Sequence, residues 1–447
     1  MCTGILWKFR DIRQGIADAE QRNGMKHQIR AIAAILLSTL IFLIGNGLLG
    51  TLIPVRGDLE GFSNLAIGVI GSAYFAGFVL GCFVAPRMLV RSGHIRTFAV
   101  AGGVAASTAL LQALFIDETV WALARMLFGF AAACIYMVIE SWLNDRASNG
   151  TRGRILAAYM TVSFAGLVIG QWLYVTASPA TFILFNLAAI FYALCLVPVG
   201  MTRLPQPVPA EVPALRPLRL FRVAPVGVAG CIAVGFANGA VWTLAPLYAH
   251  DHGLTNSLLA TFMSAFTLAG ALVQVPVGRL SDRMDRRYVI AIVSVLAAAA
   301  GLALAWLGGR SHATAIAIVT VYGAVMLPIY GLSVAHANDR LPRESFVETS
   351  ATLLLINALA SVAGPTLASL ITDRAGTAAL FVYTAAIHLM LAVFALWRIH
   401  VKGAADEEYH EPYAPVMAHA SPAALELDPR GPDTEPPVEP GGPAQTG

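Results

Sequence analysis

The sequence has little charge and little cysteine for its length. Only 12% of its 447 residues are Asp, Glu, Lys or Arg, whereas a soluble globular chain has about 25%. Apolar residues make up 57%, and the mean hydropathy is +0.69. A disordered chain has far fewer apolar residues, and a soluble chain of this size needs a more charged surface. The excess apolar residues therefore face lipid, which excludes soluble enzymes and nucleic-acid-binding proteins and indicates a polytopic membrane protein.

The sequence also lacks the usual signatures of catalysis. No two of its five cysteines have metal-ligand or redox spacing, and four of them lie in apolar runs, so we interpret them as small packing residues. There is no Gly-rich phosphate loop, no His/Cys/Asp metal constellation and no Ser-His-acid set at a membrane face. We therefore expect no metal, no cofactor and no enzymatic activity.

Long apolar runs are what the sequence has in abundance. A helix needs about 20 residues to cross a bilayer, and these runs lack the period-2 alternation of barrel strands. The stretch 155–202 carries no charge over 48 residues and contains the breaker Thr176-Ala177-Ser178-Pro179, so it is predicted to form two helices. Twelve transmembrane helices are predicted, over 31–55, 61–86, 97–116, 119–143, 155–176, 181–202, 223–248, 257–277, 288–309, 311–337, 349–372 and 375–397.

The positions of Lys and Arg predict the orientation. With a cytoplasmic N-terminus, 25 of the 29 fall in inside segments, and only Arg56, Arg310 and Arg374 fall in outside loops. Positive charge is retained on the cytoplasmic side. We therefore expect a multi-pass protein of the bacterial inner membrane with both termini in the cytoplasm, acting as a monomer in the lipid bilayer.

The polar segments divide the chain into five parts. Residues 1–30 form a charged N-terminal segment, and a Pro- and Arg-rich linker, 203–222, separates the six-helix bundle 31–202 from the six-helix bundle 223–398. Residues 403–447 hold nine Pro and nine Asp or Glu against one Arg. Such a composition cannot bury a core, so residues 399–447 are predicted to be a disordered acidic tail.

The two halves echo each other in sequence. Loop 2–3 reads GCFVAPRMLVRSGHIR from Gly81, and loop 8–9 reads GRLSDRMDRR from Gly278. Helix 4 ends in Asn-Asp-Arg at 144–146, and helix 10 ends in the same three residues at 338–340. Two similar six-helix halves joined by a polar linker are typical of transporters that rock around a site at the membrane midplane.

This 6+6 plan and the Gly278–Arg287 loop resemble the Major Facilitator Superfamily and its loop signature G-x-L-x-D-R-x-G-R-R. Within it, MVIESW at 137–142, RGRILAAYM at 152–160 and Gly170-Gln171 are similar to the YcaD-like group of bacterial transporters. The resemblance covers residues 31–398 and implies an all-α fold of two pseudo-symmetric six-helix bundles. The chain departs from it at Asp285, where the signature has glycine, and at Ala85-Pro86-Arg87, where many members have an acid.

The loop signature predicts a cytoplasmic gate that stabilises one of two states. Acids at helix ends accept hydrogen bonds from neighbouring helix N-termini, and the arginines pair with acids at other helix ends, notably Asp339 or Asp145. A solvated basic loop that only fixes topology is the alternative. The predicted gate residues are Asp282, Arg283, Arg286, Arg287, Asp145 and Asp339.

Two charged residues lie within predicted helix 4. Arg125, in a segment resembling the superfamily's R-x-x-x-G motif that is linked to proton coupling, either lines the solute pathway or extends its charge outward to the interface. Glu140 either carries a coupling proton or pairs with a loop arginine such as Arg152 or Arg154. His336, one helical turn from Asp339, is the second coupling candidate, and His388 is interpreted as a packing residue.

Helices 1, 4, 7 and 10 line the cavity in the superfamily. Amide and aromatic groups on an apolar wall suit a small amphipathic solute, although hydrogen bonding between helices also explains each of them. The candidates are Asn46, Arg125, Tyr136, Asn238, Trp242, Tyr322 and Tyr330, with Gln171 on helix 5 as a neighbour.

The sequence therefore predicts a secondary transporter that moves a small solute by alternating access. Coupling to protons stays open, as do uniport, symport and antiport. The alternative is a non-transporting membrane sensor or assembly partner built on the same scaffold.

Overall fold

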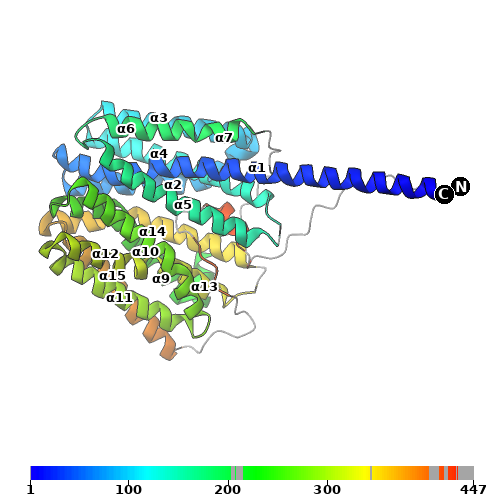
Figure 1. Ribbon diagram of the computed structural model, residues 1–447. Helices are drawn as coiled ribbons and strands as arrows, with labels where there is room; N and C mark the ends of the chain where they lie inside the picture. The colour runs from blue at the N-terminus through cyan, green and yellow to red at the C-terminus, as the bar shows by residue number, and fades with distance from the viewer. Residues whose placement is uncertain are drawn as a thin grey trace.

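The computed structural model describes residues 2–148, 150–202, 207, 215–342, 345–401, 412–416, 421–428 and 430, with 2–29 and 425–426 as backbone only. Within these ranges, twelve helices are long and apolar enough to cross a membrane, and each overlaps one predicted span. The prediction of an all-α membrane protein of two six-helix bundles is confirmed. Figure 1 shows the two bundles side by side.

The N-terminal bundle, upper in Figure 1, contains seven helical segments. The predicted sixth span is divided into α6 and α7, because α6 ends at Leu194 and Pro198 lies in the next turn. The helices are α1 (Cys2–Leu59), α2 (Asn64–Ser92), α3 (His94–Leu114), α4 (Glu118–Asp145), α5 (Arg152–Leu173), α6 (Ile183–Leu194) and α7 (Leu196–Gly200), with the 3-10 turn η1 (Tyr174–Thr176) after α5.

The C-terminal bundle follows the short linker helix α8 (Pro217–Val223). The predicted tenth span is divided at Leu327, before Pro328, into α12 and α13. The helices are α9 (Pro225–Asp251), α10 (Asn256–Ser281), α11 (Arg286–Leu307), α12 (His312–Met326), α13 (Pro328–Asn338), α14 (Phe346–Ala375) and α15 (Ala379–Val401), with the 3-10 segments η2 (Gly308–Arg310) and η5 (Pro422–Leu427).

Local sequence sets several of these helix ends. Ser63 and Asp117 cap α2 and α4 by accepting the backbone N–H of Ala66 and Val120, at 3.1 and 2.9 Å. Figure 1 shows α1 continuing as one helix well past the bundle, so residues 2–29 extend the first span. We call the end of the bundles that carries the loops at 92–94, 145–152, 281–286 and 338–346 the inner face, predicted to be cytoplasmic, and the opposite end the outer face.

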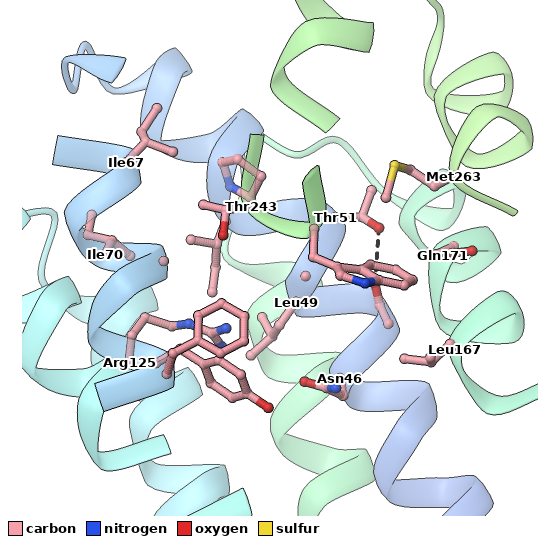
Figure 2. Close-up of a pocket in the computed structure, with 18 of the residues that line it drawn as sticks. Asn46, Leu49, Thr51, Ile67, Ile70, Arg125, Leu167, Gln171, Thr243 and Met263 are labelled. Atoms are coloured by element: carbon pink, nitrogen blue, oxygen red, sulfur yellow. Dashed lines mark hydrogen bonds between the residues drawn. The ribbon is translucent and has the colours of Figure 1, made fainter. Parts of the chain in front are cut away.

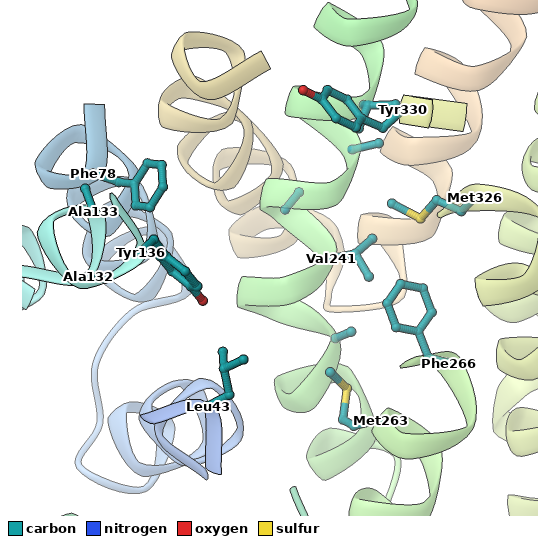
Figure 3. Packing of buried hydrophobic residues seen from close by; sticks show 14 of the residues in the cluster. Leu43, Phe78, Ala132, Ala133, Tyr136, Val241, Met263, Phe266, Met326 and Tyr330 are labelled. Atoms are coloured by element: carbon teal, nitrogen blue, oxygen red, sulfur yellow. The ribbon is translucent and has the colours of Figure 1, made fainter. Parts of the chain in front are cut away.

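Small residues allow the helices of each bundle to pack closely. A Cβ on Gly77 would lie 1.8 Å from the Met126 carbonyl oxygen, and one on Gly170 would lie 2.1 Å from that of Ile44. The small-xxx-small pairs at 77–81 and 166–170 therefore mark the α2–α4 and α1–α5 contacts. Figure 3 shows aromatic and aliphatic members of the core from both bundles, including Phe78 and Phe266.

Large apolar side chains also cover the outside of the bundles. Leu272, Trp306 and Val393 are 74%, 71% and 66% exposed. In water such a surface would be unfavourable, whereas hydrocarbon matches it. The chain is therefore a multi-pass membrane protein.

Candidate functional site

A pocket lies between the two bundles. Its lining comes from α1, α2, α4 and α5 of the first bundle and from α9 and α10 of the second. The cavity volume is about 110 Å³, below the roughly 300–1,000 Å³ of most small-molecule sites. A pocket of this size holds only a small solute unless the bundles move apart.

Five predicted cavity residues line this pocket. They are Asn46, Arg125, Tyr136, Gln171 and Trp242. Figure 2 shows Arg125 reaching in from α4, Asn46 lying on α1, and Gln171 and Met263 on the far side. The structure thus brings together side chains that are up to 196 positions apart in the sequence.

Arg125 is the charged group of the pocket. It is only 9% exposed, and its guanidinium lies over the rings of Tyr74 and Phe128, 4.8 and 4.9 Å from their centroids. Such cation–π contacts stabilise a desolvated cation by about 2 kcal/mol. Among the described residues, Arg125 has no ion-pair partner, and its buried Nη1 makes no hydrogen bond.

Three predicted cavity residues are buried but do not belong to the pocket lining. The Tyr322 hydroxyl donates to Thr384 Oγ1 at 2.9 Å and so ties α12 to α15. Asn238 and Tyr330 are 4% and 1% exposed, within the second bundle. Contact of these three residues with a solute stays a prediction.

Three polar residues of the pocket lining were not predicted from the sequence. Tyr74 on α2, Thr51 on α1 and Thr243 on α9 all line the pocket. An aromatic hydroxyl in the middle of a long apolar span is the signal that could have indicated Tyr74. The superfamily pattern of helices 1, 4, 7 and 10 omitted α2, which borders the pocket here.

The outer halves of the two bundles are in direct contact. On α2, the Ser72 hydroxyl lies 2.7 Å from that of Thr366 on α14, and Asn64 donates to the Thr372 carbonyl at 3.2 Å. His250 on α9 lies 3.9 Å from Asp58 on α1. These contacts close the outer side between the bundles.

Gln171 is part of this closure as well as of the pocket. Its Nε2 donates to Thr267 Oγ1, and its Oε1 accepts from the Ser264 hydroxyl, both at 3.1 Å. The acceptor and donor of one amide are therefore both bonded to α10, across the boundary between the bundles. Separating the bundles at this level breaks both hydrogen bonds.

Glu140 lies outside the pocket, near the inner end of α4. It is fully buried, and its carboxylate accepts from the Tyr159 hydroxyl at 2.8 Å. The other oxygen accepts from the backbone N–H of Ser421 at 2.8 Å and from the Ser421 hydroxyl. The partners of Glu140 are thus a tyrosine on α5 and a serine of the C-terminal segment. They differ from the loop arginines, Arg152 or Arg154, that were considered as its partners from the sequence.

The Gly278–Arg287 loop forms a charge cluster at the inner face of the second bundle. Arg286, nearly completely buried, donates from Nε to Asp339 at 2.6 Å and from Nη1 to Asp282 at 2.8 Å. A further hydrogen bond of 2.7 Å joins Nη1 to the Ser281 hydroxyl. Arg286 thereby links the inner ends of α10, α11 and α13.

The other predicted gate residues take separate positions. Arg287 pairs with Asp285 at 2.6 Å; burial alone would raise the pKa of Asp285, but its hydrogen bonds with Arg287 hold that pKa below the usual range. Arg283 is exposed. Asp145, exposed in the first bundle, lies 3.2 Å from its neighbour Arg146. That the gate bridges the two bundles stays a prediction, since the Arg286 and Arg287 pairs named here lie within the second.

Parts of the acidic tail lie against the inner face, which differs from the predicted disorder. Residues 412–416, 421–428 and 430 are placed on the helices, with Ser421, Leu427 and Asp428 buried. The reason is local: these stretches hold apolar and hydroxyl residues such as Tyr413, Ser421 and Leu427, and these residues meet buried partners. Residues 399–401 of the predicted tail continue α15. The remaining tail residues, and linker residues 203–206 and 208–214, lie outside the described residues.

The described residues contain no group of three His, Cys, Asp or Glu side chains that could hold a metal ion. The buried histidines His336 and His388 lie in the second bundle, away from the pocket lining.

Comparison with known proteins agrees with this architecture. The family model described as Major Facilitator Superfamily matches residues 35–365 and 228–427. An uncharacterized MFS-type transporter of Enterobacter sp. strain 638 is 28% identical over 360 residues, 80% of this chain and 93% of the relative. The uncharacterized MFS-type transporter YcaD of Escherichia fergusonii is 26% identical over 372 residues, 82% and 95% of the two chains. The nucleoside transporter NupG has a similar fold, with a TM-score of 0.69 at 13% identity over 84% of this chain and all of that one.

Proposed function

The chain belongs to the Major Facilitator Superfamily and is a transport protein rather than an enzyme, and on that premise we propose that it moves a small solute by alternating access. The observation that carries this proposal is the position of the pocket between the two bundles, beneath an outer side that is closed by contacts between them. The structure described above corresponds to a state in which the outer side is closed. Rocking of one bundle against the other would break the outer contacts and open the pocket to the outside.

The orientation of the chain in the membrane decides which side of the membrane each face meets. With the positive-inside distribution of Lys and Arg, the inner face is cytoplasmic, both termini are cytoplasmic, and the membrane is the bacterial inner membrane. Each bundle of a single chain contributes to the pocket lining, so the proposed transport unit is a monomer.

Proton coupling is the finer part of the proposal, with Glu140 as the carrier. Among the described residues of the twelve spans, Glu140 is the only buried carboxylate. A buried carboxyl that gains and loses its hydrogen-bond donors between states changes its proton affinity. Its bonds to Ser421, which belongs to a different segment, are of this breakable kind.

The test starts by identifying a solute. Purified protein would be screened against metabolites by thermal shift, because a ligand that binds the native state stabilises it. Labelled hits would then be followed in counterflow with proteoliposomes, where uptake without an ion gradient requires a carrier. A pure sensor would bind a ligand and give no counterflow, which would overturn the transport proposal.

A further inference from the structure

The pocket holds a positive charge that the described protein does not neutralise. Arg125 is only 9% exposed, and its guanidinium lies over aromatic rings rather than beside a carboxylate. A buried charge without a partner is unfavourable by several kcal/mol in general. Such a residue is retained where an anion binds and supplies the missing negative charge.

Two neutral groups of the same lining have free hydrogen-bonding capacity. Neither the Asn46 amide nor the Tyr136 hydroxyl makes a hydrogen bond to a described residue, and both line the pocket with Arg125. Apolar residues such as Leu49, Ile70 and Met263 form much of the remaining wall. A guanidinium, an amide and a phenol on an apolar wall fit a carboxylate attached to a short apolar body.

We propose that the solute is a small organic anion, a carboxylate bound by Arg125 with Asn46 and Tyr136 as its neutral hydrogen-bond partners. This inference rests on the proposed transport function and names the substrate class of the same pocket. The cavity volume of about 110 Å³ limits the solute to a few heavy atoms in this state. Arg125 would fix the anionic end, and the apolar wall would select the body.

The test compares the binding of a charged compound with that of a neutral compound of the same shape. Binding of butyrate and of its neutral amide, butyramide, would be measured by thermal shift and calorimetry on the full chain. We expect butyrate to bind and butyramide to bind at least about tenfold more weakly, because the guanidinium would then lack its counter-ion. The Arg125→Gln variant should lose this preference, and Arg125→Lys should keep part of it.

The outcomes separate this inference from the transport proposal. Preference for the amide, or butyrate binding that Arg125→Gln leaves unchanged, would overturn the anion site even if neutral solutes are transported in counterflow. Absence of counterflow with a bound carboxylate would instead overturn transport and leave the site intact. An Arg310→Gln variant, outside the pocket lining at the outer face, is the matched control and should bind butyrate like the parent chain.

A second inference comes from the C-terminal segment, whose described parts contact both bundles. Its first anchor is Tyr413 in the second bundle. A Cβ on Gly278 or Gly331 would lie 1.9 or 2.4 Å from Tyr413 side-chain atoms, so this side chain fills the space that the two glycines of α10 and α13 leave. The Tyr413 backbone N–H donates to both oxygens of Asp282, at 2.9 and 3.1 Å, and burial raises the pKa of the Tyr413 phenol.

The second anchor is Ser421 in the first bundle. Both its N–H and its hydroxyl donate to Glu140 on α4, and Ser421 is completely buried. The following turn, η5, packs on α4, α5 and α14. Eight residues after Tyr413, the same segment is therefore fixed to the opposite bundle.

The third anchor returns to the second bundle. Arg430 lies over the ring of Phe346 at the start of α14, 5.4 Å from its centroid, and pairs with Asp428 at 2.5 Å. Burial disfavours the charge of Arg430, but Asp428 more than offsets this, and the pKa of Arg430 is raised. Residues 413–416, 421–428 and 430, which we call the strap, thus contact α10 and α13, then α4, and then α14 at the inner face.

We infer that the strap is an autoinhibitory element that holds the outer-closed state. When the outer side opens, the inner ends of the bundles must approach each other, and the strap is bonded to both of these ends, through Asp282 after α10 and Glu140 on α4. Its anchors must therefore release for a full transport cycle. Because the strap is tethered to α15, it rebinds at a high effective concentration after each release.

Truncation after Val401 tests this inference in proteoliposomes. We expect the initial rate of counterflow to rise at least threefold. The matched control is a chain ending at Gly431, which keeps every described strap residue and should show the parent rate. The double variant Tyr413→Ala, Ser421→Ala should also be faster than the parent, and it preserves the chain length if the truncated protein is poorly expressed.

An accessibility measurement supplies a second readout. With the native cysteines replaced, Ser421→Cys should react slowly with a maleimide at the inner face and faster when Tyr413 is also replaced by alanine. An unchanged or reduced transport rate in both strap variants would overturn autoinhibition. Rapid maleimide labelling of Ser421→Cys in the otherwise unaltered strap would overturn the buried anchor itself.

Discussion

Gly68 on α2 controls how closely the outer halves of the bundles approach. A Cβ at this position would lie 2.1 Å from the Ser369 hydroxyl oxygen, 2.4 Å from its Cβ and 2.8 Å from the Pro365 carbonyl oxygen on α14. The backbone oxygen cannot move away by rotation of a side chain. The Gly68→Ala variant should therefore push α2 and α14 apart, and the clash exists only while the outer side is closed.

The size of the effect follows from the cost of overpacking. Inserting a methyl group into a well-packed interface costs about 1–3 kcal/mol. If that cost falls on the outer-closed state alone, the ratio of outer-open to outer-closed molecules rises roughly 5- to 150-fold. The neighbouring contacts between Ser72 and Thr366, at 2.7 Å, would lengthen in the same movement.

The assay measures access to the pocket from outside. Thr51 on α1 is buried and lines the pocket, so a cysteine at this position, in a chain without the native cysteines, reports on outer opening. A membrane-impermeant thiol reagent added to intact cells should label Thr51→Cys faster in the presence of Gly68→Ala, by a factor within the stated range.

Gly103→Ala is the control, since Gly103 is exposed on α3 and a Cβ there meets nothing within 4 Å. It should leave the labelling rate unchanged. If a folded and inserted Gly68→Ala protein is labelled at the parent rate, the contact between α2 and α14 does not close the outer side, and the reasoning fails.

Three further predictions concern topology, the inner charge cluster and coupling. A reporter that is active only in the periplasm, fused after Val401, should give no signal, because 25 of the 29 basic residues then lie inside; a strong signal would refute the orientation. Asp339→Asn should lower the melting temperature of the purified protein by several degrees, since breaking a buried ion pair costs about 3–5 kcal/mol and Arg286 would lose the Asp339 carboxylate; an unchanged melting temperature would show that the pair adds little. Glu140→Gln should abolish uptake driven by a pH gradient while leaving downhill exchange, whereas retained accumulation would exclude Glu140 as the proton carrier.

The spans and the two-bundle plan could be predicted because they depend on local composition. A run of about 20 apolar residues must form a helix in lipid whatever its neighbours are, since no water is present to satisfy its backbone. The breaker at 176–179 and the repeated Asn-Asp-Arg at 144 and 338 supplied the hairpin and the pseudo-symmetry in the same way. The linker and much of the tail lack such a signal.

The site could be predicted only in part. Arg125 was identifiable because a charge within an apolar span is rare and unfavourable. Tyr136, Tyr322 and Tyr330 have the same chemistry and similar settings in the sequence, yet Tyr136 lines the pocket and Tyr322 bonds to Thr384 within its own bundle. Which face of a helix borders the other bundle depends on its rotation and tilt, and these follow from packing against several neighbours.

The sequence by itself therefore determined the membrane class, the number of helices, the expected orientation and the charged residue that a solute site would use, because each follows from the cost of placing polar or charged groups in hydrocarbon. Only the tertiary structure decided which polar residues share the pocket with Arg125, that the outer side is closed through α2 and α14, and that Glu140 meets Ser421. Those contacts join residues up to 308 positions apart in the closure and 281 apart at Glu140. Their formation depends on how whole helices and the C-terminal segment pack together, a property of the assembled fold that no local pattern encodes.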